Sequence, residues 1–196
     1  MPAEPIRILL RIAGILEDLG IPYLTGGSVA SSIFGIPRAT QDIDLVVDMP
    51  EARVKSFVQA VQAEFYVDQD TVTHAVRLHS SFNAIHFETV QKIDFFMKGQ
   101  NDYACEEMRR RVAVAVDEAS QRKVFLASPE DIFLQKLIWY RMGALISERQ
   151  WNDVLGVIKV QGDRLDQDYI NRWAGELAIA DLVEEAWRAA AANRQS

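Results

Sequence analysis

The chain has 196 residues, of which 49% are hydrophobic and 25% are charged, and its formal net charge at pH 7 is −7. This size and composition describe a soluble globular chain of one domain or two small lobes. The acidic balance argues against broad, sequence-blind binding of nucleic acid, which depends on neutralising many phosphates, but it leaves room for RNA held at one basic groove.

No stretch of the sequence has the length and apolarity of a membrane span, and no basic-then-apolar leader begins it. The single cysteine, Cys105, cannot form an intrachain disulfide and fits a reducing compartment. It lies in a helical pattern, which favours a packed thiol over a nucleophile. We therefore expect a cytoplasmic protein with no membrane contact.

The first elements lead to a glycine turn. Apolar residues at helical spacing predict a helix over residues 4–19, and a short strand follows at 23–25. The strand stops at Gly26 and Gly27, where the backbone can turn tightly and approach a ligand. Ser28 then opens a helix over 28–35, and its hydroxyl and free backbone N–H groups suit the phosphates of a nucleotide.

Two aspartates mark the next strand, predicted at about residues 42–48. Asp42 and Asp44 are two residues apart, so both carboxylates lie on one face while Ile43 and Leu45 face the core. Like charges on a largely apolar strand repel, and hard cations with oxygen ligands relieve the repulsion. The expected ion is Mg²⁺. The simpler alternative is a plain turn followed by a solvated strand end.

The middle of the chain alternates strands and helices, which predicts an α/β core. The predicted elements are a helix over 50–64, a strand at 65–68, a helix over 71–78 begun by Asp70, hairpin strands at 83–88 and 91–97, a helix over 101–111, and strands at 112–116 and 123–127.

Asp94 is the only acidic residue of the apolar strand KIDFFM. An unpaired carboxylate in such a strand is costly, so we expect it to have a partner. The hairpin register decides whether His86 lies near Asp94 or on the opposite face. The basic run 109–111 is typical of a solvated helix end, and an RNA contact is the alternative.

From Ser128 the composition changes, and all four tryptophans lie beyond it. Four helices are predicted, over about 129–142, 147–160, 167–177 and 180–193. The tryptophans fit the packing of a small bundle better than base stacking. We therefore predict a core domain over 1–127 and a helical lobe over 128–196.

The stretch YLTGGSVASSIFGIPRATQDIDLVV resembles the signature of the nucleotidyltransferase superfamily, which has the polymerase beta-like fold, and is most similar to its AbiEii toxin-like branch. The resemblance implies a mixed α/β (α+β) sheet flanked by helices and followed by a C-terminal helical bundle. It also implies that Gly26, Gly27 and Ser28 hold the triphosphate of an NTP. Asp42 and Asp44 would bind two Mg²⁺ ions.

The same resemblance extends to residues outside that stretch. Asp94 matches the third carboxylate of the family, a metal ligand and general base. Arg38 and Thr40 match an arginine-x-threonine pattern that often precedes the aspartates. The segments SPEDIFLQKLIWYR and RQWNDV resemble the helical half of the AbiEii-like branch, which implies that Lys136 and Asp153 serve the nucleotide site, with Asp153 holding the lysine in place.

The resemblance implies a Mg²⁺-dependent nucleotidyltransferase that moves a nucleoside monophosphate from an NTP to an acceptor hydroxyl. The acceptor would be RNA, such as tRNA ends, a protein side chain or a small molecule, and the AbiEii-like relatives imply a toxin with an antitoxin partner. The alternatives are a catalytically silent regulatory protein of the same fold and an antibiotic nucleotidyltransferase. An aspartyl phosphatase is disfavoured, because Leu45 follows the second aspartate and the glycine pair would have no role.

Overall fold

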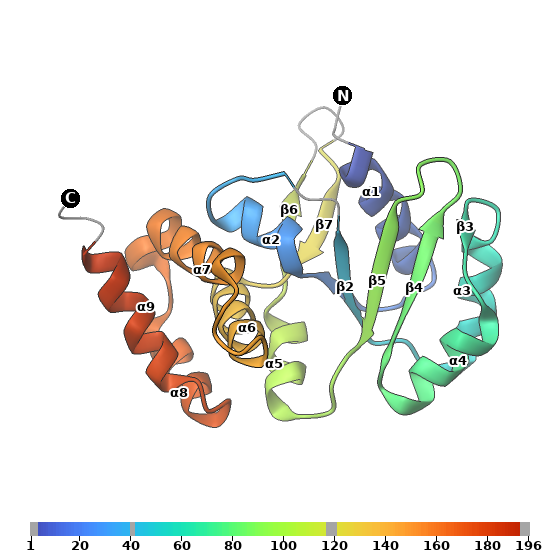
Figure 1. The fold of residues 1–196 in the computed structure, drawn as a ribbon. Helices are drawn as coiled ribbons and strands as arrows, with labels where there is room; N and C mark the ends of the chain where they lie inside the picture. The colour runs from blue at the N-terminus through green and yellow to red at the C-terminus, as the bar shows by residue number, and fades with distance from the viewer. Residues whose placement is uncertain (1–3, 40–41, 117–120, 193–196) are drawn as a thin grey trace. The chain divides into compact units, whose positions relative to one another are not determined.

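The computed structural model describes residues 4–39, 42–116 and 121–192. The chain divides into two compact units (Figure 1). Unit 1 comprises Met1–Val29 and Thr40–Ala127, and unit 2 comprises Ala30–Ala39 and Ser128–Ser196. The two units are described separately below.

Unit 1 contains a sheet of seven strands. The strands are β1 (Tyr23–Thr25), β2 (Ile43–Val47), β3 (Phe65–Tyr66), β4 (Ser81–His86), β5 (Lys92–Met97), β6 (Val112–Ala115) and β7 (Lys123–Leu126). Their order is β3-β4-β5-β2-β1-β7-β6. The β2–β5 and β1–β7 pairs are parallel and the other neighbours are antiparallel, so the sheet is mixed. This agrees with the predicted fold class.

The helices of unit 1 follow the predicted order. They are α1 (Glu4–Asp18), the start of α2 (Gly27–Phe34), the 3₁₀ turn η1 (Glu51–Arg53), α3 (Val54–Val61), α4 (Gln69–Leu78) and α5 (Asp102–Arg110). The helix expected over 50–64 is therefore shorter and begins as a 3₁₀ turn. The helix expected to begin at Asp70 is capped by Asp68, whose side chain accepts a hydrogen bond from the Thr71 N–H.

The core of unit 1 lies on one face of the sheet. Along β2 the side chains of Ile43, Leu45 and Val47 are fully buried, while those between them are half-buried. On the same face Phe57 of α3 packs edge-on against Phe95, with ring centroids 5.5 Å apart. This alternation confirms that Ile43 and Leu45 face the core, and it leaves Asp44 on the other face.

Unit 2 is built from α6 (Pro129–Met142), α7 (Glu148–Gln161), the turn η2 (Gly162–Arg164), α8 (Gln167–Glu176) and α9 (Ala180–Ala192). Residues 30–39, which include the end of α2, belong to the same unit. The segment lies close against α7, since a Cβ on Gly35 would be 3.0 Å from the Val157 nitrogen. Trp187 packs on Phe133 at 5.8 Å, in keeping with the predicted packing role of the tryptophans.

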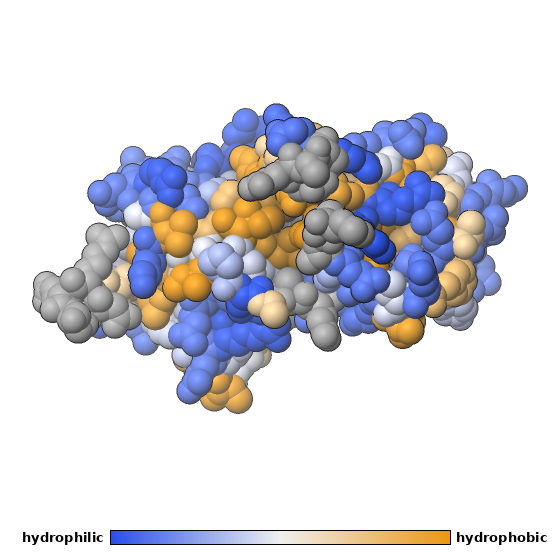
Figure 2. Space-filling model, turned by 90° about the horizontal axis from the view of Figure 1, so that it is seen from above, coloured by the Kyte–Doolittle hydropathy of each residue, from blue (hydrophilic) through white to orange (hydrophobic). Residues whose placement is uncertain are grey.

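The surface is mixed in character. Seen from above, hydrophilic residues cover much of the face and hydrophobic residues form patches between them (Figure 2). Within the described ranges, no helix has the length and apolarity needed to cross a membrane. In the part of the chain that the structure describes, the exposed large apolar side chains are those of Ile33, Ile36, Tyr66, Leu78, Phe87, Val90, Trp139, Met142, Leu145, Ile146 and Val160.

Candidate active site

The glycine turn holds the backbone of α2 against Asp44. Gly27 is the first residue of α2 and has a φ of +56°, a left-handed conformation that favours glycine. A Cβ at this position would lie 1.8 Å from Asp44 Oδ2, so any side chain here would collide with the carboxylate. The Gly26 N–H donates to the Asp44 carbonyl over 2.9 Å. The turn therefore fixes the start of α2 and the Asp44 side chain together.

Asp44 and Asp94 lie side by side on neighbouring strands. Their Cα atoms are direct partners in the parallel β2–β5 pairing, and both residues are half-buried on the face opposite to the core. Asp42 is exposed and precedes β2 by one residue. Ser28, in the first turn of α2, is 8% exposed. The structure thus brings together the glycine turn and two of the three predicted carboxylates.

Asp94 has the partner that its sequence context predicted. Lys92, two residues earlier on β5, places its Nζ atom 2.8 Å from Asp94 Oδ2. Asn83 lies across the β4–β5 pair from Asp94. His86 is three residues further along β4, and the alternation of side chains puts it on the opposite face, where its ring lies 5.0 Å from the ring of Phe65. His86 is therefore not part of this cluster.

The donor chemistry of the cluster fits Mg²⁺. Asp44 and Asp94 supply hard carboxylate oxygens from adjacent strands, and the space that a Cβ would fill at Gly27 lets the backbone approach Asp44 closely. Within residues 4–39, 42–116 and 121–192, no three His, Cys, Asp or Glu side chains are gathered into a ready metal site. The assignment of Asp42, Asp44 and Asp94 as metal ligands stays a prediction.

Replacing Gly27 by alanine is expected to reduce the free energy of unfolding by about 1–3 kcal/mol, because an L-residue in the left-handed region costs energy and the new methyl group collides with Asp44. Chemical denaturation would measure the loss. Gly26→Ala is the matched control: a Cβ there meets nothing within 4 Å, so its effect should stay within about 0.5 kcal/mol. Equal stability of the two variants would contradict this account of the turn.

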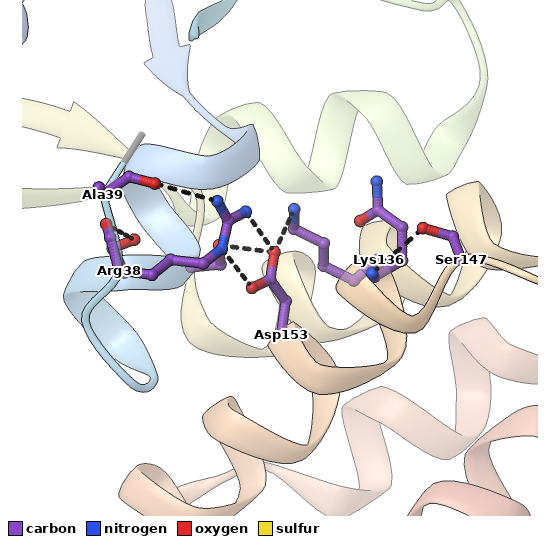
Figure 3. Close-up of polar contacts among 8 residues, drawn as sticks. Arg38, Ala39, Lys136, Ser147 and Asp153 are labelled. Atoms are coloured by element: carbon purple, nitrogen blue, oxygen red, sulfur yellow. Dashed lines mark hydrogen bonds and ion pairs between the residues drawn. The ribbon is translucent and has the colours of Figure 1, made fainter. Parts of the chain in front are cut away.

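Three of the predicted nucleotide-binding residues form an ion-pair cluster inside unit 2 (Figure 3). Lys136 Nζ lies 2.8 Å from Asp153 Oδ2, and the Arg38 guanidinium donates two hydrogen bonds of 2.9 Å to the same carboxylate. Ser31 adds a hydrogen bond of 3.2 Å. Arg38 and Lys136 approach Asp153 from opposite sides (Figure 3). The ion pair is the arrangement in which Asp153 would hold Lys136 in place, as expected from the sequence.

This cluster is largely withdrawn from solvent. Lys136 is 4% and Asp153 8% exposed. Burial alone would raise the pKa of Asp153, but the hydrogen bonds and positive charges of Arg38 and Lys136 outweigh it and lower that pKa below its usual 3.8. These contacts give the cluster a structural role that needs no nucleotide. A role in nucleotide binding stays a prediction.

Two further expectations concern residues away from these clusters. Thr40 lies outside the described residues. In the basic run, Arg109 pairs with Glu106, and Arg111 donates to the Met108 carbonyl and stacks on the Phe125 ring at 4.8 Å. The first two contacts lie at the end of α5 and the third reaches β7, and an RNA contact by the run stays a prediction.

No known family profile and no curated protein sequence matches the chain. Several solved structures match 90% or more of it. An antigenic nucleotidyltransferase-like protein from Paracoccidioides brasiliensis is 16% identical, with a TM-score of 0.55, over 92% of this chain and 93% of its own. The antibiotic-resistance factor ANT(2'')-Ia in solution is 14% identical, with a TM-score of 0.58, over 93% and 99%.

A crystal structure of ANT(2'')-Ia in complex with adenylyl-2''-tobramycin gives the same TM-score of 0.58 at 14% identity, over 90% of this chain and 98% of that one. At such identities the likeness establishes the fold alone. The mixed seven-stranded sheet with its C-terminal helices is therefore a nucleotidyltransferase-like fold.

Proposed function

We propose that the protein transfers a nucleoside monophosphate from an NTP to an acceptor hydroxyl and releases pyrophosphate. The observation that carries the proposal is the position of Asp44, which lies against the backbone of Gly27 at the start of α2 and directly beside Asp94 on the next strand. A helix start that favours anions beside paired carboxylates that favour cations is suited to a metal-bound triphosphate.

In this mechanism, Gly26, Gly27 and Ser28 would bind the β- and γ-phosphates through the first turn of α2. Asp42, Asp44 and Asp94 would hold two Mg²⁺ ions, whose role when bound is to stabilise charge on the α-phosphate and to lower the pKa of the attacking hydroxyl. Asp94 would accept the hydroxyl proton. The bond between the α-phosphorus and the bridging oxygen breaks as the acceptor oxygen bonds to that phosphorus, and pyrophosphate leaves.

The acceptor is one of three classes: RNA such as tRNA ends, a protein side chain, or a small hydroxylated molecule. The adenylyl-tobramycin complex of ANT(2'')-Ia, a protein with the same fold, supports including aminoglycoside-like polyols among the small molecules. If the acceptor is RNA or a protein, we further propose that the protein belongs to the AbiEii-like branch. It would then be a toxin whose activity an antitoxin protein neutralises. Growth arrest on expression would support this further proposal.

The test is incubation of the purified protein with Mg²⁺, each of the four α-labelled NTPs and a cell extract, followed by separation of RNA, protein and small molecules. We expect label in one fraction, no transfer when EDTA removes the metal, and recovery when Mg²⁺ is returned in excess. The labelled fraction identifies the acceptor class. NTP binding with no label in any fraction would overturn the proposal in favour of a catalytically silent regulatory protein.

A further inference from the structure

Lys92 occupies a place in the carboxylate cluster that the proposed mechanism does not use. It is the first residue of β5 and lies two residues before Asp94, so the two side chains project from the same face of the strand. Its Nζ atom lies 2.8 Å from Asp94 Oδ2, a distance typical of a charge-assisted hydrogen bond. Half of the lysine side chain is exposed, against 21% of the aspartate side chain.

The ammonium group is influenced by all three carboxylates. The hydrogen bond to Asp94 raises the pKa of Lys92 most, and the charges of Asp94, Asp42 and Asp44 raise it further, while partial burial opposes them. Asp44, Asp94 and the exposed Asp42 just before β2, taken with the Lys92 ammonium, have a formal net charge of −2, that is −3 plus 1. One divalent cation would balance that charge, whereas a second would need an anion of its own, such as a triphosphate.

The hydrogen bond from the Lys92 ammonium and a bond to a metal ion would compete for the same Asp94 oxygen, Oδ2. Mg²⁺ binds carboxylate oxygens at about 2.1 Å, so a metal ligated by Oδ2 would lie within a few ångströms of Nζ at its present position. Two cations at that separation repel. Lys92 also lines, with Asp42, a pocket of about 460 Å³, which gives the lysine side chain room to move away from Asp94.

We propose that Lys92 is a built-in counter-ion of the carboxylate cluster, and that a divalent cation must displace its ammonium from Asp94 to gain that carboxylate as a ligand. The inference rests on the proposed function in taking Asp42, Asp44 and Asp94 as metal ligands. Its consequence is that Lys92 weakens metal binding in the absence of nucleotide. The metal is then loaded efficiently only together with the negative charge of the triphosphate.

The test measures binding of Mn²⁺, as a spectroscopic probe, to the nucleotide-free protein by electron paramagnetic resonance, with Mg²⁺ competition. Lys92→Met removes one positive charge near the divalent ion, so we expect this variant to bind Mn²⁺ about tenfold more tightly than the wild type. Lys92→Arg keeps the charge and should bind no more tightly than the wild type. Lys55→Met, which removes the exposed lysine of α3, should bind within about twofold of it.

Two different failures can be told apart. Equal Mn²⁺ affinity of Lys92→Met, Lys55→Met and the wild type would overturn the counter-ion role while leaving the metal site in place. No Mn²⁺ binding to any of the four proteins would overturn the metal site itself, and the counter-ion role with it. Thermal unfolding of each variant confirms that it is folded, and Lys92→Gln provides a second neutral substitution if the methionine variant does not fold.

Discussion

The Asp44→Asn variant is expected to lose nucleotidyl transfer by about 10³-fold or more while remaining folded. The substitution keeps the shape of the side chain against Gly27 but removes the negative charge beside Asp94. A bound metal contributes several kcal/mol to stabilising the transition state, and each 1.4 kcal/mol or so is a factor of about ten in rate. Single-turnover transfer of labelled NMP, in the acceptor class found with the wild type, would measure the loss.

The matched control is Asp48→Asn, which removes the same charge from the chain just beyond the other end of β2. Its side chain is 52% exposed and pairs with Lys98 at 3.2 Å, away from the glycine turn. Transfer by Asp48→Asn should stay within about twofold of the wild type, as is usual for an exposed position outside a site. If Asp44→Asn turned over as fast as Asp48→Asn, Asp44 would not be a ligand of the catalytic metal.

The largest expected effect on stability is that of Asp153→Asn, which should lower the free energy of unfolding by about 3–5 kcal/mol. This substitution leaves the buried Lys136 cation, and the partly exposed Arg38 cation beside it, without their carboxylate, and breaking a buried ion pair from one side has that cost. Urea unfolding would measure it. Asp163→Asn, at an exposed aspartate of the same unit, should change stability by no more than about 0.5 kcal/mol.

Asp153 should also make the free energy of unfolding depend on pH, in a direction that follows from its pKa. Because the folded protein holds the pKa of Asp153 below 3.8, its contribution to stability is complete above that pH and is lost as the pH falls through the lower, folded-state pKa. The wild type should therefore lose stability below about pH 4 more steeply than Asp153→Asn. If the unfolding free energies of the two proteins changed equally with pH below about pH 4, Asp153 would not be held ionised by its partners.

Lys136→Met separates the structural role of the cluster from a role in nucleotide binding. Asp153 keeps both hydrogen bonds from Arg38 in this variant, and methionine fills a similar volume, so the loss of stability should be smaller than in Asp153→Asn. A raised KM for the NTP, measured at a temperature where the variant is fully folded, would assign Lys136 to the nucleotide. An unchanged KM would leave it with the structural role alone.

The parts of the fold that the sequence predicted well are those with strong local signals. The strand 23–25 has the expected bounds because the glycine pair ends it. The helices after Ser128 and Ser147 begin where expected because both serines cap them through their side chains. The start of α4 was wrong by two residues, since Asp68 and Asp70 are both suitable caps and only the backbone conformation distinguishes them.

The sequence could predict those parts of the candidate site in which two side chains lie on the same face of one strand. The family resemblance, and no pattern in the strands themselves, associated Asp94 with Asp44, and the structure shows the two residues as direct partners across β2 and β5. Lys92 was overlooked, although its spacing of two residues from Asp94 was a usable signal. The Arg38–Asp153 pair joins residues 115 positions apart, and no local pattern reports such a contact.

The parallel pairing of β2 with β5 also determines when the two carboxylates can meet during folding. β4 and β5 are joined by a turn of residues 87–91 and can pair as a local hairpin, whereas β2 is separated from β5 by the whole segment 48–91. Closing a long segment costs more chain entropy than closing a short one, and contacts distant in sequence form more slowly. We therefore expect the Asp44–Asp94 pair to form later in folding than the β4–β5 hairpin.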